Sequence, residues 1–236
     1  MEHYDAIVIG GGLVGSAIAY GLVRARLRVA LLDEGDVAFR ASRGNFGLIW
    51  VQSKGDGAPH YQRWTRLSAQ EWSALATELE AKTGIAVDYK RPGGVHLCLG
   101  EAEIEARHAW MERMRVQSGN FGFDYRIVDR RELTEMLPGL GPAVSSASWT
   151  PYGLMTGMPT RSTCFMRCTR VLPKTADENG GRYLPNSTVT EAGAAPGDFR
   201  IQLAGGEIGA PKVVLLPGSA TPPWRGDSGS PPRSSR

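Results

Sequence analysis

Apolar residues near the start of the chain form two short runs with a helical pattern between them. Tyr4–Ile9 is mostly apolar and hardly alternates, which is typical of a strand buried on both faces. A helix is expected to follow and to end at about Arg26. Its apolar face is expected to comprise Val14, Ile18, Leu22 and Ala25. A second apolar run, Arg28–Leu32, predicts another buried strand, so the pattern is strand, helix, strand.

The central part of the chain alternates between helical and strand patterns. Ala58–Lys82 predicts a long helix, and Val87–Leu99 predicts two strands joined by a Pro-Gly-Gly turn. The larger apolar residues of the long helix recur at roughly helical spacing and are expected in the core: Trp64, Leu67, Trp72, Leu75 and Leu79. Glu101–Gln117 predicts a helix that is acidic in its first turn and basic in its last. Asp129 is placed to cap a short helix, with Glu132 three residues on.

The last third of the chain contains ordered patterns between two stretches that have none. Residues 154–179 show neither a helical nor a strand period. Tyr183–Thr190 predicts a strand, positions 199–203 alternate, and Glu207–Leu216 is expected to return as a final buried strand. Residues 217–236 hold five Pro, three Gly and five Ser, so this segment cannot bury a core and is predicted to be disordered.

Composition excludes several classes of protein. Hydrophobic residues make up 42% and charged residues 22% of the 236, which excludes wholesale disorder. A net charge of +3 without a long Lys/Arg run gives no case for nucleic-acid binding. No apolar stretch reaches the ~18 residues of a membrane span. Three cysteines make no disulfide framework and no basic leader is present, so we expect a reduced, cytoplasmic protein.

A glycine-rich hexapeptide, Gly10 to Gly15, lies between the first strand and the first helix and has the pattern G-x-G-x-x-G. Gly10 permits a tight turn, Gly12 lets the backbone approach a pyrophosphate, and Gly15 lets the helix pack closely on the sheet. The helix N-terminus adds partial positive charge for the phosphates. Asp33, after the second strand, is placed to accept hydrogen bonds from ribose hydroxyls. The pattern predicts a dinucleotide site; the alternative is an empty glycine turn in an α/β domain.

The residues after this unit favour a flavin over a nicotinamide nucleotide. Asp33 and Glu34 are followed by a small, polar, glycine-spaced loop at Ala41–Ile49. A nicotinamide-binding domain normally continues directly with another crossover helix and strand. The loop therefore argues against a nicotinamide-binding domain.

These motifs together resemble the FAD-dependent glycine oxidase, sarcosine oxidase and D-amino-acid oxidase family. The resemblance implies an α/β fold, with a Rossmann-like FAD-binding domain of the glutathione-reductase type and an inserted, incomplete α+β substrate domain. The extents expected for the FAD-binding domain are 1–84 and 150–216, with 85–149 in the substrate domain and 217–236 as a tail. An antiparallel sheet with helices on its outside is expected in the substrate domain.

The resemblance also implies contacts along most of the FAD molecule. The residues implied for the pyrophosphate are Gly10, Gly11, Gly12, Leu13, Val14 and Gly15. Those implied for the ribose are Asp33 and Glu34, those for the flavin side are Ser42, Asn45, Gly47 and Leu48, and the one for the adenine is Val189. No catalytic residue is assigned, and no metal site is expected because His60, His96 and His108 share no ligand spacing.

The family reaction is hydride transfer from the carbon beside an amine to the flavin, giving an imine that hydrolyses. The resemblance therefore implies a small amine or amino acid as substrate, with no nucleic acid and no membrane span. A partner subunit and a homo-oligomer both stay open. Two other functions stay open as alternatives: an NAD(P)-binding Rossmann dehydrogenase and a non-catalytic nucleotide-binding remnant.

The two stretches without pattern suggest an interrupted copy of a longer family member. The family expects an Asp-Gly-x-x-Asn-Pro stretch near Met155, and the neighbouring reading frame of those codons permits one. A second shift, at Leu216, permits a family-like Ala-Gly-Leu-Gly-Asn-Ala. We hypothesise that both segments are translated out of frame, which makes Cys164 and Cys168 artefacts of a truncated copy; gene codons that forbid these frames would end the hypothesis.

Overall fold

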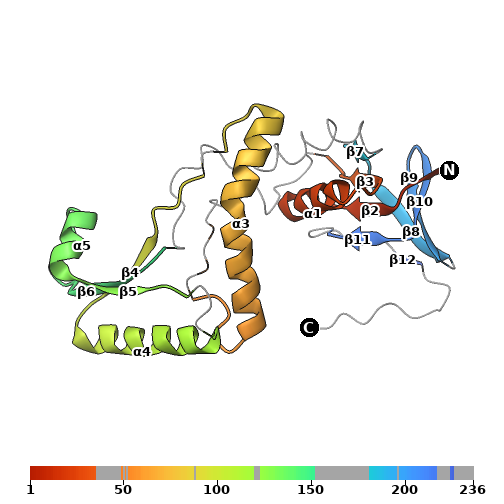
Figure 1. Cartoon of the computed structure of the whole chain (residues 1–236). Coiled ribbons are helices and arrows are strands. Elements are labelled where there is room, and N and C mark those ends of the chain that lie inside the picture. The colour runs from red at the N-terminus through yellow and green to blue at the C-terminus, as the bar shows by residue number, and fades with distance from the viewer. Residues whose placement is uncertain are drawn as a thin grey trace. The chain divides into compact units, whose positions relative to one another are not determined.

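A computed structural model describes residues 1–35, 49, 51, 53–87, 89–119, 123–151, 181–195, 197–216 and 224–225 (Figure 1). The chain divides into two compact units. The first comprises Met1–Asn45, Leu79–Val87 and Thr160–Arg236, and the second comprises Phe46–Glu78 and Asp88–Pro159. Segments that are far apart in the sequence thus share one unit.

The first unit contains a four-stranded parallel sheet in the order β11-β2-β3-β7. Its strands are β2 (Ala6–Ile9), β3 (Val29–Leu32), β7 (Arg182–Leu184) and β11 (Val213–Leu215). Every residue of β2 and β3 is buried, as their unbroken apolar sequence predicts. Helix α1 (Leu13–Arg24) makes the crossover between these two parallel neighbours. Because all four strands run in one direction, their carboxyl ends meet at one edge of the sheet.

A second sheet of the same unit has five strands in the order β1-β10-β9-β8-β12. Its strands are β1 (Glu2–His3), β8 (Val189–Ala195), β9 (Asp198–Leu203), β10 (Gly206–Ala210) and β12 (Trp224–Arg225). β8, β9 and β10 form an antiparallel meander, whereas β1 and β12 join the two edges in parallel.

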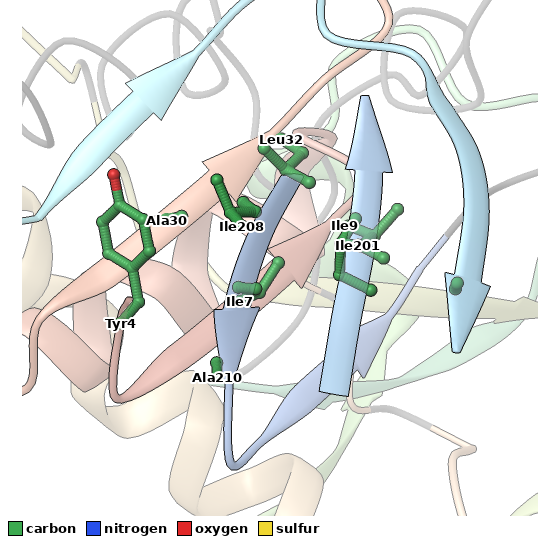
Figure 2. Packing of buried hydrophobic residues seen from close by; sticks show 9 residues of the cluster. Tyr4, Ile7, Ile9, Ala30, Leu32, Ile201, Ile208 and Ala210 are labelled. Atoms are coloured by element: carbon green, nitrogen blue, oxygen red, sulfur yellow. The ribbon is translucent and has the colours of Figure 1, made fainter. Parts of the chain in front are cut away.

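The core of the first unit lies on both faces of the parallel sheet. Ile7 and Ile9 of β2 belong to one buried cluster with Ile201 and Ile208 of the five-stranded sheet (Figure 2). Val8, between them, belongs to a second cluster with Ala19 and Val23 of α1, because successive side chains of a strand point to opposite faces. The parallel sheet is therefore covered by α1 on one face and by the meander on the other.

The second unit contains a three-stranded antiparallel sheet in the order β4-β6-β5. Its strands are β4 (Gly94–Cys98), β5 (Arg126–Asp129) and β6 (Ser146–Thr150), and its helices are α4 (Glu101–Gln117), α5 (Arg130–Met136) and most of α3 (Pro59–Thr83). α4 has the predicted bounds. The predicted cap of α5 is confirmed, since the Glu132 N–H donates to Asp129 Oδ1 over 2.9 Å.

Two expected strands are each divided in the structure, and a third does not form among the described residues. Tyr183–Thr190 is divided between β7 and β8, because the chain turns at Asn186, whose φ is 55°. Glu207–Leu216 is divided between β10 and β11, which belong to different sheets. Of the two strands expected in Val87–Leu99, only β4 forms among the described residues.

Two expected apolar faces are confirmed only in part. On α1, Ile18 and Leu22 pack against the second buried cluster, as expected. Val14 is 59% exposed, and the buried side of α1 consists of Gly15, Ser16, Ala19, Tyr20 and Val23. Small residues on that side let the helix approach the sheet, which large ones would prevent.

On α3, Trp64 is 69% exposed and Leu67 is 42% exposed, although Leu79 is buried as expected. Gln62 and Arg66 are buried instead. The Gln62 amide donates to the Met114 carbonyl over 2.9 Å, and the Arg66 guanidinium lies 4.2 Å from the centre of the Phe123 ring. These polar and cation–π contacts offset part of the cost of burying the two side chains.

Several expectations concern residues that the structure does not describe. All of residues 154–179, with Cys164 and Cys168, lie outside the described residues, as does most of 217–236. Within the latter segment Trp224 and Arg225 form β12, which pairs with β8. In the described parts of the chain no helix has the length and apolar character needed to cross a membrane. The domain boundaries expected from the sequence stay a prediction.

Candidate dinucleotide site

The glycine turn begins where β2 ends, at the carboxyl edge of the parallel sheet. The Gly10 N–H donates to the Leu32 carbonyl at the end of β3 over 2.9 Å. On the other side, the Leu216 N–H donates to the Ile9 carbonyl over 2.8 Å. Gly10 has a φ of 105°, and a Cβ there would lie 2.1 Å from the Leu216 carbonyl oxygen. Only glycine fits this conformation and this space.

The turn leads directly into α1, whose N-cap is Gly12. A Cβ on Gly15 would lie 1.8 Å from the Gly10 carbonyl oxygen, so the helix starts in direct contact with the turn. Ser16, which is fully buried, donates from its hydroxyl to the Gly11 carbonyl over 3.1 Å. The first turn of α1 contains no acidic residue, so no carboxylate there opposes an anion at the positive end of the helix dipole.

Asp33 joins the glycine turn to the end of β3. Its side chain is buried, with the residue 4% exposed. The Gly11 N–H donates to Asp33 Oδ2 over 2.8 Å, and the Gly35 N–H donates to Asp33 Oδ1 over 2.9 Å. A carboxylate oxygen can accept more than one hydrogen bond, so these two contacts are compatible with a role in binding ligand hydroxyls.

The connection between β7 and β8 fixes the backbone of Asp33. The Asp33 N–H donates to the Leu184 carbonyl over 3.1 Å, and the Ser187 N–H donates to the Asp33 carbonyl over 2.8 Å. Val189, the residue expected beside adenine, starts β8 two residues after Ser187 and is half-buried. The structure therefore brings the predicted ribose acid and the segment that leads to the predicted adenine residue together.

The other predicted site residues differ in their placement. Gly11 is buried, Gly12 and Leu13 are half-buried, and Val14 and Glu34 are exposed. The residues expected on the flavin side all lie outside the described residues: Ser42, Asn45, Gly47 and Leu48. In the described parts of the chain no group of three His, Cys, Asp or Glu is placed to hold a metal ion.

Sequence reasoning missed three residues that build the turn: Ser16, Ser187 and Leu216. Ser16 was detectable, because a serine directly after Gly15 continues the run of small residues on the helix side that must approach the sheet. Ser187 and Leu216 act through backbone groups. Such contacts depend on which strands become neighbours in the fold, so no local sequence pattern predicts them.

The arrangement suits a nucleotide diphosphate. Backbone N–H groups at the start of an acid-free helix favour an anion. A buried carboxylate next to that helix start is an acceptor for sugar hydroxyls. Close contacts within the turn require glycine at positions 10, 11 and 15, and glycine-rich turns of this kind let a phosphate approach the backbone. The residues present therefore fit the pyrophosphate and ribose of a dinucleotide cofactor.

Comparisons with known proteins agree with this chemistry. Residues 5–235 match the family described as FAD dependent oxidoreductase. An opine oxidase subunit from Agrobacterium tumefaciens (strain Ach5) is 33% identical over 219 residues, which are 92% of this chain and 57% of the relative. Glycine oxidase from Bacillus licheniformis is 26% identical over 218 residues, 92% of this chain and 54% of the relative. The chain spans about half the length of these curated relatives.

Solved structures show the same fold. The crystal structure of glycine oxidase from Geobacillus kaustophilus matches with a TM-score of 0.74 at 24% identity, over 92% of this chain and 55% of that one. The L-amino acid deaminase from Proteus vulgaris matches with a TM-score of 0.73 at 19% identity, over 92% of this chain and 47% of that one. These likenesses confirm the predicted α/β, FAD-binding fold class.

Proposed function

The chain belongs to the FAD dependent oxidoreductase family, and from this premise we propose that it holds FAD by its AMP and pyrophosphate half and serves the oxidation of a small amine or amino acid. One observation carries the proposal. The buried Asp33 carboxylate accepts from Gly11 at the head of α1, so the ribose acceptor and the phosphate-binding turn form one rigid group.

Each part of this group has a role toward the cofactor. The backbone of Gly10–Gly15 would bind the pyrophosphate, and Asp33, flanked by Glu34, would accept from the ribose hydroxyls. Val189 would lie beside the adenine. The implied flavin-side residues are Ser42, Asn45, Gly47 and Leu48. FAD, if bound here, would supply the acceptor for a hydride from the carbon beside the substrate's amine, and the protein would orient the cofactor and the substrate.

The relatives support the substrate class and suggest a partner. Their names include opine oxidase and glycine oxidase, so an amino acid or an opine-like amine is the substrate class proposed. Because the two opine oxidase relatives are each named as one subunit of that enzyme, we propose a partner subunit ahead of a homo-oligomer. A cytoplasmic location is proposed from the small number of cysteines, three in the chain.

Anaerobic reduction tests the proposed activity. The purified full chain, reconstituted with FAD, is mixed without oxygen with glycine, sarcosine or an opine. We expect at least one of these amines to bleach the flavin absorbance, because the amine carbon delivers its hydride to the flavin. The matched control is an N,N-dimethylated carboxylate-free amine of similar size. A yellow chain that no amine reduces contradicts the activity, and a colourless chain that binds NADH contradicts FAD as the cofactor.

A further inference from the structure

The connection between β7 and β8 contains a turn whose two sides bind the backbone of Asp33. The chain changes direction at Asn186, whose φ of 55° lies in the left-handed region. Immediately after this turn, the Ser187 N–H meets the Asp33 carbonyl at 2.8 Å. Immediately before it, the Leu184 carbonyl accepts from the Asp33 N–H at 3.1 Å. The two sides of the turn therefore hold both backbone polar groups of Asp33.

The Asn186 side chain also packs where the Asp33 carboxylate is held. A Cβ on Gly35 would lie 2.3 Å from Asn186 Oδ1, so the amide lies directly against the Gly35 backbone. The Gly35 N–H in turn donates to Asp33 Oδ1. Asn186 thus contacts Gly35, whose N–H orients one oxygen of the carboxylate. The Gly11 N–H orients the other oxygen.

We infer that Asn186 is a positioning residue for ribose recognition: its left-handed turn and its packing on Gly35 hold the Asp33 carboxylate in the orientation that accepts from the ribose hydroxyls. The inference rests on the proposed function, because it assumes that Asp33 binds the ribose. It goes beyond that function by assigning a role to a residue far from the glycine turn in sequence. Asn186 itself needs no contact with the nucleotide.

The residue type at position 186 fits this role. Asparagine enters the left-handed region at low cost, glycine does so at none, and a β-branched residue is strongly disfavoured there. Asn186→Val should therefore shift the turn and with it Asp33. Asn186→Gly keeps the turn and removes only the side chain that packs on Gly35. The two variants separate the contribution of the backbone from that of the amide.

The test compares ADP with 2′,3′-dideoxy-ADP, by calorimetry on the nucleotide-free full chain. The two probes differ only in the ribose hydroxyls, so the ratio of their dissociation constants measures what Asp33 contributes. We expect the wild-type chain to prefer ADP by about tenfold, the size of a charge-assisted hydrogen bond. Asn186→Val should reduce the preference to about twofold. Asn186→Gly, which keeps the turn but loses the packing on Gly35, should give a preference between those of the wild type and Asn186→Val.

Arg26→Val is the matched control. Arg26 has a φ of 63°, is exposed, and follows the opposite end of α1 in the same unit, so this variant strains a left-handed residue away from Asp33. It should keep the tenfold preference even if the melting temperature falls. An Asn186→Val variant that binds both nucleotides more weakly but still prefers ADP tenfold overturns the inference alone. A wild-type chain that binds both nucleotides without preference removes Asp33 from the ribose and overturns that part of the proposed function together with the inference. A wild-type chain that binds neither nucleotide overturns the proposed site itself.

Discussion

Replacing Gly15 with alanine is expected to weaken FAD binding strongly and to destabilise the first unit. The added Cβ would lie 1.8 Å from the Gly10 carbonyl oxygen, far inside van der Waals contact, so either the turn or the helix must move. Overpacking of this kind costs about 1–3 kcal/mol in the free energy of unfolding. Displacing the N–H groups that would bind the pyrophosphate should weaken FAD binding about 100-fold, equivalent to about 3 kcal/mol.

Gly21→Ala provides the control for this substitution. Gly21 lies in the same helix, and a Cβ there would meet nothing within 4 Å. Alanine favours a helix interior over glycine by about 1 kcal/mol, so this variant should be slightly more stable and should bind FAD normally. Chemical denaturation and FAD titration of both variants give the result. If Gly15→Ala binds FAD as well as Gly21→Ala does, the glycine turn is not the phosphate site.

Replacing Asp33 with alanine is expected to have the second largest effect. The change removes the acceptor of the Gly11 N–H, which is buried, and that of the Gly35 N–H. Leaving a buried donor without a partner costs about 1–3 kcal/mol, so the free energy of unfolding should fall by at least that amount. FAD should bind at least about tenfold more weakly, because the ribose hydroxyls lose a charged acceptor. Denaturation and FAD titration measure the two effects separately.

Asp5→Ala is the appropriate comparison for Asp33→Ala. Asp5 Oδ2 also accepts from a backbone group, the Arg28 N–H at 2.7 Å, but this contact is exposed to solvent. Water can replace the lost acceptor there, so stability should fall by about 1 kcal/mol or less, with FAD binding unchanged. Equal losses of FAD affinity in the two variants would mean that Asp33 acts only through general stability.

Elements whose signals are local could be predicted from the sequence. β2 and β3 follow from unbroken apolar runs, α4 from its charged ends, and the start of α5 from the Asp129 cap. The buried faces of α1 and α3 could not. Gln62 is buried because the Met114 carbonyl accepts from it, and that partner lies on a different helix. Hydrophobic periodicity alone assigns such polar positions to the surface.

The candidate site likewise has residues that the sequence could predict and residues that only the fold brings together. The glycine turn and Asp33 were recognisable, because the motif and the acid after the second strand are close in sequence and have a fixed geometric meaning. The support for Asp33 from Leu184 and Ser187 was not, because β7 lies beside β3 only in the folded sheet. The sequence predicted one continuous strand across 183–190, whereas the hydrogen bonds of Leu184 and Ser187 with Asp33 require a turn at Asn186.

A comparison of FAD with FMN tests the central claim most directly. The claim is that the first unit recognises the AMP and pyrophosphate half of the cofactor, which FAD has and FMN lacks. The purified full chain, freed of bound nucleotide, is titrated with each flavin, and ADP is added as a competitor. We predict that FAD binds in a one-to-one complex, that ADP displaces it, and that FMN binds far more weakly. Equal binding of FMN and FAD, or FAD binding that ADP leaves unchanged, would contradict the claim.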